Sequence, residues 1–182
     1  KYKVVGFDTD KKRVNQIKKG IDKNNEFPKK QILNKKFKVS SDANAIKSCN
    51  IYIVAVPTPL KNYKPDLRNL ENANTIISKF LKKKDIVVYE STVYPGLTEE
   101  FCVVQLQKKS KLLANKDFFY GYSPERVNPG DKSKKIENII KITSGSSKKT
   151  ASIIDKIYKS VITAGTYPVS SIKVAEAAKV IE

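Results

Sequence analysis

The segment YSPERVNPGD, residues 122–131, gathers the side chains of this sequence that are best suited to acid–base chemistry. It places the carboxylate of Glu125 beside the guanidinium of Arg126 and close to the amide of Asn128, in a stretch with neither helical nor strand periodicity. Because the sequence contains no histidine, a general acid or base here must be a carboxylate, a lysine, a cysteine or a positioned water. The alternative is a simple loop ion pair between Glu125 and Arg126, which would contribute less than about 1 kcal/mol if exposed.

The elements that must position this segment alternate between strands and helices. Their apolar patterns predict strands at residues 2–7, 38–40, 51–56, 85–90, 118–122, 139–143 and 161–164, and helices at 10–19, 43–47, 66–82, 95–106, 148–160 and 169–182, with residues 21–37 irregular. Several of the strands are nearly continuous runs of Val and Ile, which is typical of parallel strands covered on both faces. We therefore expect an α/β, Rossmann-like, doubly wound and mainly parallel sheet with helices on both faces.

Polar segments follow four of these strands. They are Asp8, PTP at 57–59, ESTVYPG at 90–96, and the segment 122–131. Ligands of such sheets bind beyond the carboxyl ends of the strands. We therefore expect the four segments to converge on one edge, with residues 122–131 irregular because they form a loop of the site.

Asp8 has two interpretations. An acidic residue that ends the second strand of a dinucleotide-binding unit accepts hydrogen bonds from the adenosine ribose and repels a 2′-phosphate. A strand-terminal Asp is also a common cap of the helix that follows it. The seven glycines contain no Gly-x-Gly-x-x-Gly motif and the sequence has no methionine, so we expect a first strand and helix to precede Lys1.

The composition adds limits on partners and compartment. The formal net charge is +18, yet only Arg13, Arg68 and Arg126 are arginines, and the lysines are scattered. This favours a lysine-rich composition over nucleic-acid binding, while the positive field would attract a phosphorylated substrate. With no long apolar run and no leader we expect no membrane partner and a cytoplasmic protein. Cys49 and Cys102 are isolated, so we expect two buried structural thiols and no metal site.

Six motifs together resemble a known family. VVGFD, VPTPL, PDL, YESTVYPGLTEE, YSPERVNPGD and IKVAEAAKVIE occur in an order and spacing similar to those of the UDP-glucose/GDP-mannose dehydrogenase family, and most similar to its bacterial UDP-N-acetylhexosamine 6-dehydrogenase branch. The resemblance covers nearly the whole chain. It implies oxidation of the C6 hydroxymethyl of a nucleotide sugar to a carboxylate by two NAD, through an aldehyde and a cysteine thioester, for surface polysaccharide synthesis.

The resemblance also implies roles for individual residues. The residues implied in cofactor binding are Asp8 and Arg13 at the adenosine ribose, Val56, Pro57 and Thr58 along the NAD cleft, and Ser91 and Thr92 near the nicotinamide. Thr92 would also position a catalytic water, Glu125 would act on that water and on the thioester, and Lys179 would stabilise a developing oxyanion. Together with Glu125 and Lys179, the residues implied in substrate binding are Arg126, Val127 and Asn128.

Without the resemblance, two of these residues have plainer interpretations. Thr92 would be a strand-end residue or a cap at a helix entry. Lys179 lies in AEAAK, which forms helix by propensity alone and places Glu176 three residues before it. Sequence alone would make Lys179 a solvated helix residue.

The resemblance further implies a domain organisation. Residues 1–167 would be an N-terminally incomplete NAD-binding domain and 168–182 the start of a connecting and dimerisation helix. The family's nucleophilic cysteine belongs to a second, nucleotide-sugar-binding domain, and neither Cys49 nor Cys102 sits in its glycine-flanked context. We therefore expect this chain to be inactive alone and the intact protein to be a homodimer. The alternatives are a noncatalytic remnant or binding module, and a UDP-glucose 6-dehydrogenase; the gluco or galacto epimer stays open.

Overall fold

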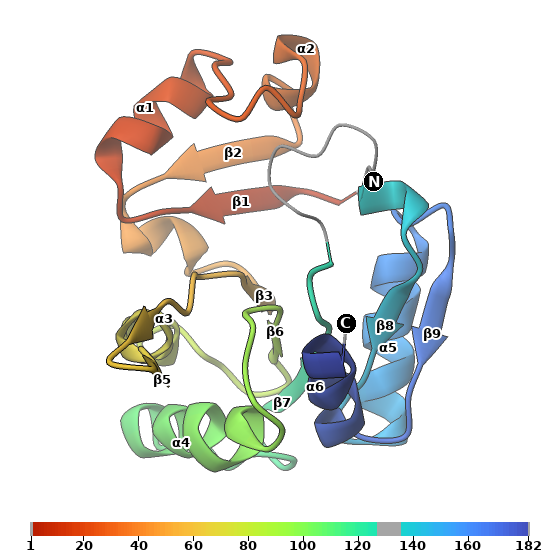
Figure 1. The fold of residues 1–182 in the computed structure, drawn as a ribbon. Coiled ribbons are helices and arrows are strands. Elements are labelled where there is room, and N and C mark those ends of the chain that lie inside the picture. Colours follow the sequence, from red (N-terminus) through yellow and green to blue (C-terminus); the bar gives the residue numbers. More distant parts are fainter. Residues whose placement is uncertain (1, 127–135, 182) are drawn as a thin grey trace. The chain divides into compact units, whose positions relative to one another are not determined.

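The computed structural model describes residues 2–126 and 136–181, and the chain divides into two compact units (Figure 1). The first unit comprises residues 1–49 and 127–135, and the second comprises residues 50–126 and 136–182.

The first unit is built on a pair of parallel strands. Its elements are β1 (Val4–Phe7), α1 (Lys11–Lys18), α2 (Lys29–Ile32), β2 (Phe37–Ser40) and the 3₁₀ turn η1 (Ala43–Ile46), with β1 paired to β2. Helix α1 begins where the Asp10 carboxylate accepts hydrogen bonds from the two backbone amides of Lys12 and Arg13. It ends at Gly20, whose φ of 73° is the left-handed conformation that glycine adopts most easily. Both boundaries agree with the sequence prediction.

The second unit contains a three-stranded parallel sheet. Its strands are β3 (Ile51–Val54), β6 (Ile86–Tyr89) and β7 (Phe119–Tyr122), in the order β3-β6-β7. Two further strand pairs belong to this unit: the parallel pair β8 (Lys141–Thr143) and β9 (Thr166–Pro168), and the antiparallel hairpin β4 (Leu60–Lys61) and β5 (Lys64–Pro65).

Helices cover both faces of this sheet (Figure 1). They are α3 (Arg68–Ser78), the π-helical turn η2 (Thr98–Val103), α4 (Val104–Ser110), α5 (Lys148–Lys159) and α6 (Ile172–Ile181), with a 3₁₀ turn η3 (Ile136–Asn138). On one face Ile86 and Val88 of β6 pack against Ile154 of α5. On the other face the hydroxyl of Tyr89 donates a 2.6 Å hydrogen bond to Asn74 of α3. Because both faces are covered, β6 is apolar throughout, which confirms the predicted α/β class.

A close backbone approach joins β7 to the segment that follows β8. The amides of Ser144 and Ser146 donate to the carbonyls of Tyr122 and Tyr120, at 3.1 and 2.8 Å. Gly121 makes this approach possible, because a Cβ at that position would lie 2.4 Å from both the Ser144 carbonyl oxygen and Cδ1 of Ile154. The segment after β8 is thereby held against the last strand of the sheet.

Some predicted elements need correction. The strand predicted at 161–164 is wrong: these residues form the turn after α5, where the amides of Val161 and Ile162 both donate to the Tyr158 carbonyl, and the strand lies at β9. The apolar signal there reflects Ile162, which packs in the core. The helix predicted at 95–106 begins later, at Thr98, and ends at Ser110. Helix α2 lies in the stretch predicted to be irregular, and the β4–β5 hairpin was not predicted.

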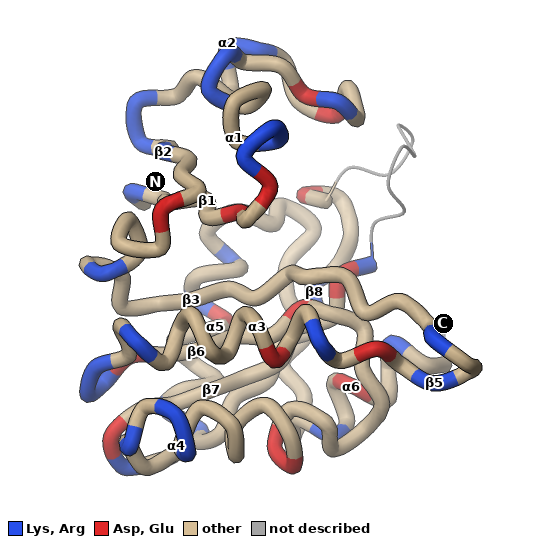
Figure 2. The backbone as a smooth tube through the Cα atoms, turned by 90° about the vertical axis from the view of Figure 1, so that its left-hand side faces the viewer, with Lys and Arg blue, Asp and Glu red and all other residues tan. Residues whose placement is uncertain are grey.

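Charged residues are spread over the elements of both units. Lys and Arg recur along α1, α2 and α4, while Asp and Glu lie in other segments, such as η2 (Figure 2). Among the described helices, none combines the length and the apolar character that crossing a bilayer would require.

Candidate functional site

Three of the four predicted polar segments meet at the carboxyl edge of the β3-β6-β7 sheet. The loops after β3 and β6 are tied by two hydroxyl groups: Ser91 donates to the Val56 carbonyl and Thr58 donates to the Thr92 carbonyl, each at 2.7 Å. Asn69 of α3 donates to the Pro57 carbonyl at 2.8 Å, which holds the PTP turn. These five cofactor-site candidates of the sequence therefore lie together.

Thr92 presents its side chain to solvent. It is exposed, and within residues 2–126 and 136–181 its hydroxyl takes part in no hydrogen bond. It does not cap the following helical segment, whose first turn is preceded by Leu97. The interpretation of Thr92 as a helix cap is therefore wrong, and its hydroxyl is available to a ligand.

The loop after β7 joins the same edge. The amides of Glu90 and Ser123 extend the strand ladder by donating to the carbonyls of Val54 and Tyr89, at 2.8 and 2.9 Å. The hydroxyl of Tyr122 donates to the Ser91 carbonyl at 3.1 Å. Burial raises the pKa of Tyr122 well above its usual range, so this hydroxyl stays a protonated donor.

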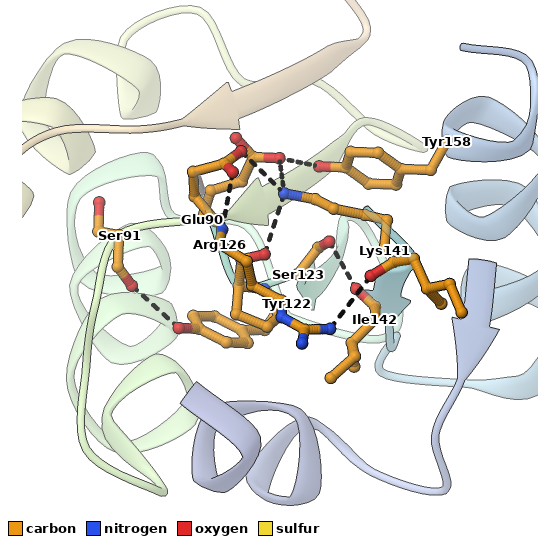
Figure 3. A network of polar contacts seen from close by, with 11 residues as sticks. Glu90, Ser91, Tyr122, Ser123, Arg126, Lys141, Ile142 and Tyr158 are labelled. Carbon is orange, nitrogen blue, oxygen red and sulfur yellow. Dashed lines mark hydrogen bonds and ion pairs between the residues drawn. The ribbon is translucent and has the colours of Figure 1, made fainter. Parts of the chain in front are cut away.

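Glu125 lies in a polar cluster with Glu90, Lys141 and Tyr158. Figure 3 labels the last three of these residues. The Nζ of Lys141 lies 3.2 Å from Oε2 of Glu125 and 3.0 Å from Oε1 of Glu90. The hydroxyl of Tyr158 donates to Oε1 of Glu90 at 2.7 Å. The cluster brings two carboxylates and one ammonium together beside the candidate active edge.

Lys141 was not predicted as a site residue. Lys141 is only 3% exposed, and it lies on β8 within the otherwise apolar run IIKIT. The sequence signal that could have found it is a lysine inside an otherwise apolar strand. Because lysine is almost never fully buried unless it is paired, such a lysine indicates a buried ion pair. Its partners are far away in the sequence, so the pairing itself required the fold.

Arg126 makes contacts through both its backbone and its side chain. Its amide donates to Oε1 of Glu125 at 2.7 Å, and its Nη1 donates to the Ile140 carbonyl at 3.3 Å. Glu125 also forms an ion pair with Lys141, a partner that the sequence did not indicate. Val127 and Asn128, the other predicted sugar contacts, lie outside the described residues.

Helix α6 carries Lys179 and Glu176. Glu176 is fully buried and accepts hydrogen bonds from the amides of Gly96 and Thr98, at 2.6 and 2.9 Å. Its carboxylate is therefore engaged by the loop after β6, and Lys179 is half-buried without an ion pair among the described residues. This leaves the ammonium of Lys179 available, in contrast to the solvated, Glu176-paired lysine that sequence alone suggested.

The remaining candidates, Asp8 and Arg13, belong to the first unit. Asp8 follows β1, is exposed, and accepts a 2.8 Å hydrogen bond from the Asp10 amide at Oδ1. The helix cap is Asp10, so the interpretation of Asp8 as the cap is wrong. Arg13 donates from Nη2 to Asp22 at 3.0 Å, and its Nη1 is buried without a partner in the described chain.

The resemblance assigned these two side chains to the adenosine ribose of a dinucleotide. The second oxygen of Asp8 offers an acceptor to a ribose diol, and Nη1 of Arg13 is an unpartnered donor. By contrast, no group of three or more His, Cys, Asp or Glu side chains among the described residues is placed to hold a metal ion.

The two cysteines are free thiols. Cys102 is buried as expected, and burial raises the pKa of its thiol to about 12, so it is not a nucleophile at neutral pH. Cys49 is half-buried, which is more exposed than the sequence suggested.

Comparisons with known proteins extend this description. Residues 1–162 match the UDP-glucose/GDP-mannose dehydrogenase family, NAD binding domain. The chain is 52% identical to the UDP-N-acetyl-D-glucosamine 6-dehydrogenase of Salmonella typhi, over 98% of this chain and 43% of that protein. It is 50% identical to the enzyme of the same name from Pseudomonas aeruginosa, over 100% of this chain and 44% of that protein. The chain therefore spans less than half the length of these relatives.

The fold also matches a solved structure. The UDP-D-ManNAc dehydrogenase from Pyrococcus horikoshii superposes with a TM-score of 0.90 and 30% sequence identity, over 99% of this chain and 44% of that chain. The likeness agrees with a Rossmann-type fold for the strands and helices described above.

Proposed function

The chain belongs to the UDP-glucose/GDP-mannose dehydrogenase family and contains its NAD-binding domain, and from this premise we propose that it is part of a UDP-N-acetylhexosamine 6-dehydrogenase. The intact enzyme would oxidise the C6 hydroxyl of the sugar to a carboxylate for surface polysaccharide synthesis. The observation that carries the proposal is identity of about one half, over the whole chain, to two proteins named UDP-N-acetyl-D-glucosamine 6-dehydrogenase. On that basis the gluco epimer is the proposed substrate.

The cofactor is NAD, which accepts a hydride from the substrate carbon. Asp8 and Arg13 are proposed to bind its adenosine ribose, because they offer an acceptor and an unpartnered donor. The proposed cleft residues are the five tied together after β3 and β6: Val56, Pro57, Thr58, Ser91 and Thr92. The proposal assigns residues 1–167 to NAD binding and 168–182 to the start of a connecting helix.

Thr92 and Glu125 are proposed to handle the water that the second half of the reaction requires. Thr92 has an exposed hydroxyl without a described partner, and the Glu125 side chain is 33% exposed at the same sheet edge. Lys179 is proposed to stabilise the developing oxyanion, since its ammonium has no ion pair among the described residues. Arg126, Val127 and Asn128 are the proposed sugar contacts.

The test uses the full-length protein that contains this sequence. NADH formation is followed by absorbance with UDP-N-acetylglucosamine, UDP-N-acetylgalactosamine and UDP-glucose, each supplied with NAD. We expect kcat/KM to be highest for UDP-N-acetylglucosamine and at least about 10-fold lower for UDP-glucose, because pocket contacts to the acetamido group are lost. A preference for UDP-glucose would contradict the substrate assignment, and no NADH with any of them would contradict the proposed function.

The intact protein is further proposed to be a homodimer that associates through α6 and its continuation. Helix α6 buries Ile172 and Ala175 and leaves Val174 and Ile181, which lie on one side of the helix, exposed at 46% and 86%. An exposed apolar side of a helix suits a second copy of the same helix. Sedimentation of the full-length protein should give the dimer mass, and a monomer at micromolar concentration would contradict this proposal.

A further inference from the structure

Among the residues that the structure describes, four charged residues are buried. One is a cation, Lys141, and the others are the acids Asp85, Asp155 and Glu176. An ammonium group has three N–H donors and no acceptor. Lys141 Nζ has three oxygens within reach: Oε1 of Glu90 at 3.0 Å, Oε2 of Glu125 at 3.2 Å and the carbonyl of Pro124 at 3.0 Å (Figure 3). The contacts with Pro124 and Glu125 are hydrogen bonds, and the contact with Glu90 is an ion pair.

The position of Lys141 is itself fixed from two sides. Glu90, at the end of β6, is held by the hydroxyl of Tyr158 on α5 at 2.7 Å. The Tyr158 ring also lies beneath the ammonium, with Nζ 5.4 Å from its centroid. Burial raises the pKa of Tyr158 well above its usual range, so its hydroxyl remains a donor to Glu90. The ammonium is thus held by β6 and α5 as well as by the loop that carries Glu125.

Glu125 in turn is held through both of its oxygens. Oε1 accepts from the Arg126 amide at 2.7 Å, and Oε2 accepts from Lys141. Both contacts fix the direction of the carboxylate. The side chain of Glu125 is 33% exposed while that of Glu90 is 13% exposed, so Glu125 is the carboxylate that can reach a ligand.

The charges decide what happens without Lys141. Glu90 and Glu125 both lie within 3.2 Å of one nitrogen, in a region where water screens poorly. With the ammonium removed, the two carboxylates repel each other, and the more exposed one can turn to solvent. The direction of the Glu125 carboxylate therefore depends on the cation.

We propose that Lys141 is the positioning residue that holds Glu125 in its reactive orientation at the carboxyl edge of the sheet. This rests on the function proposed above, in which Glu125 is the base. Lys141 would act only through Glu125 and would not itself touch the substrate.

The experiment is a double-mutant cycle on the kcat of the full-length enzyme with Lys141→Met and Glu125→Gln. We expect Lys141→Met to lower kcat by about 10- to 100-fold, with KM changed by less than about threefold, because a misplaced base slows the chemical step more than binding. If Lys141 works through Glu125, the double variant will be no slower than Glu125→Gln alone. The proposal would be overturned if the two losses in kcat multiplied in the double variant. It would also be overturned if the kcat of Lys141→Met lay within about twofold of the parent value.

Asp155→Asn is the matched control. Asp155 is buried beside the same strand, where it accepts from the hydroxyls of Thr143 on β8 and Thr166 on β9. Its loss should lower the melting temperature while leaving kcat within about twofold. A kcat loss equal to that of Lys141→Met would mean that any damage to β8 slows the enzyme, and would overturn a specific role for Lys141.

Crystal structures separate this proposal from the proposed function. In the parent, Oε2 of Glu125 should lie within hydrogen-bond distance of Lys141, and in Lys141→Met the Glu125 carboxylate should turn away. This readout does not depend on turnover, so it holds if the parent forms no NADH. Should Lys141→Met fail to fold, Lys141→Gln keeps a donor to the Pro124 carbonyl and takes its place. An unmoved Glu125 in the variant would overturn the proposal.

Discussion

The Oε2 atom of Glu176 accepts a 2.6 Å hydrogen bond from the backbone amide of Gly96, a residue 80 positions earlier in the chain. Oε1 of the same carboxylate accepts from the Thr98 amide at 2.9 Å, at the start of the helical segment η2. The first amides of a helix have no partner inside it, and a carboxylate is favoured there. Glu176 thus attaches α6 to the loop that follows β6.

This attachment predicts a large loss of stability for Glu176→Ala. Two buried amides would lose their acceptor, which should lower the free energy of unfolding by about 2–4 kcal/mol. Glu176→Gln, which keeps one acceptor oxygen, should lose less. Urea unfolding of the chain measures both variants.

The control for Glu176 lies between the same two segments. Lys173 of α6 pairs with Glu100 of η2 at 3.2 Å, and both side chains are more than half exposed. Lys173→Ala should therefore cost less than about 1 kcal/mol. Equal losses for Glu176→Ala and Lys173→Ala would show that the buried carboxylate has no special role.

Asp22 predicts a loss of stability in acid. Partial burial would raise the pKa of this carboxyl, but hydrogen bonds from Arg13 and from the amides of Asn24, Glu26 and Phe27 outweigh it and lower the pKa from 3.8 to about 2. A carboxyl with a lowered pKa stabilises the fold above its unfolded pKa, and this contribution disappears as the pH falls from about 4 to about 2. Below that window both states are protonated.

Asp22→Asn tests this pH dependence. In the parent chain, melting temperatures should fall across the window from about pH 4 to about pH 2, with about 1 kcal/mol of the loss due to Asp22 after allowance for solvent screening. The Asn variant should be less stable than the parent at neutral pH, and the difference should shrink in acid. A difference that stays constant with pH would show that the charge of Asp22 is not the cause.

Asp8 predicts the choice of cofactor in the full-length enzyme. Its carboxylate would face the 2′-phosphate of NADP, so the parent should use NAD at least about 10-fold better than NADP, and Asp8→Ser should narrow that preference. The kcat/KM values for the two cofactors measure it. Asp10→Asn, two residues away, keeps a capping side chain and should leave the preference unchanged. Equal use of NAD and NADP by the parent would contradict the role of Asp8.

The proposed role of Glu125 predicts that a covalent sugar–enzyme intermediate accumulates in the Glu125→Gln variant. Glu125→Gln keeps the size of the side chain but removes the base, so hydrolysis of the thioester should slow by about 100-fold or more while substrate binding survives. Mass spectrometry of the full-length variant mixed with substrate and NAD should then detect a sugar attached to the enzyme. A structural Glu125 would instead lower the melting temperature and weaken binding together, with no adduct. Turnover at the parent rate would remove the catalytic role altogether.

The alternation of strands and helices, and the meeting of the loops after β3, β6 and β7, could be predicted because they depend on local patterns. The apolar residues of β6 by themselves predict a buried strand. Because parallel strands have their carboxyl ends at the same edge of a sheet, the loops after them are expected to meet there. The ends of α1 could be predicted for the same reason, since Asp10 and Gly20 act within one turn of the helix.

What could not be predicted depends on distant partners. Lys141 is buried because Glu90 and Glu125 converge on it from two other strand ends. The composition of residues 161–164 predicts a strand, but the apolar side chain of Ile162 instead packs in the core beside α5. In the same way the partners of Glu176 are the amides of Gly96 and Thr98, which lie about 80 residues away in the sequence.

The contacts of Lys141 with Glu90, Pro124 and Glu125 limit which segments of this site can be exchanged between proteins. The loop that carries Glu125 takes its cation from β8 and the partner of that cation from β6. A chimaera that exchanges residues 119–126 with a distant relative would therefore separate the glutamate from both. Engineering of substrate range should move the three segments as one unit, or leave all three in place and vary the sugar contacts alone.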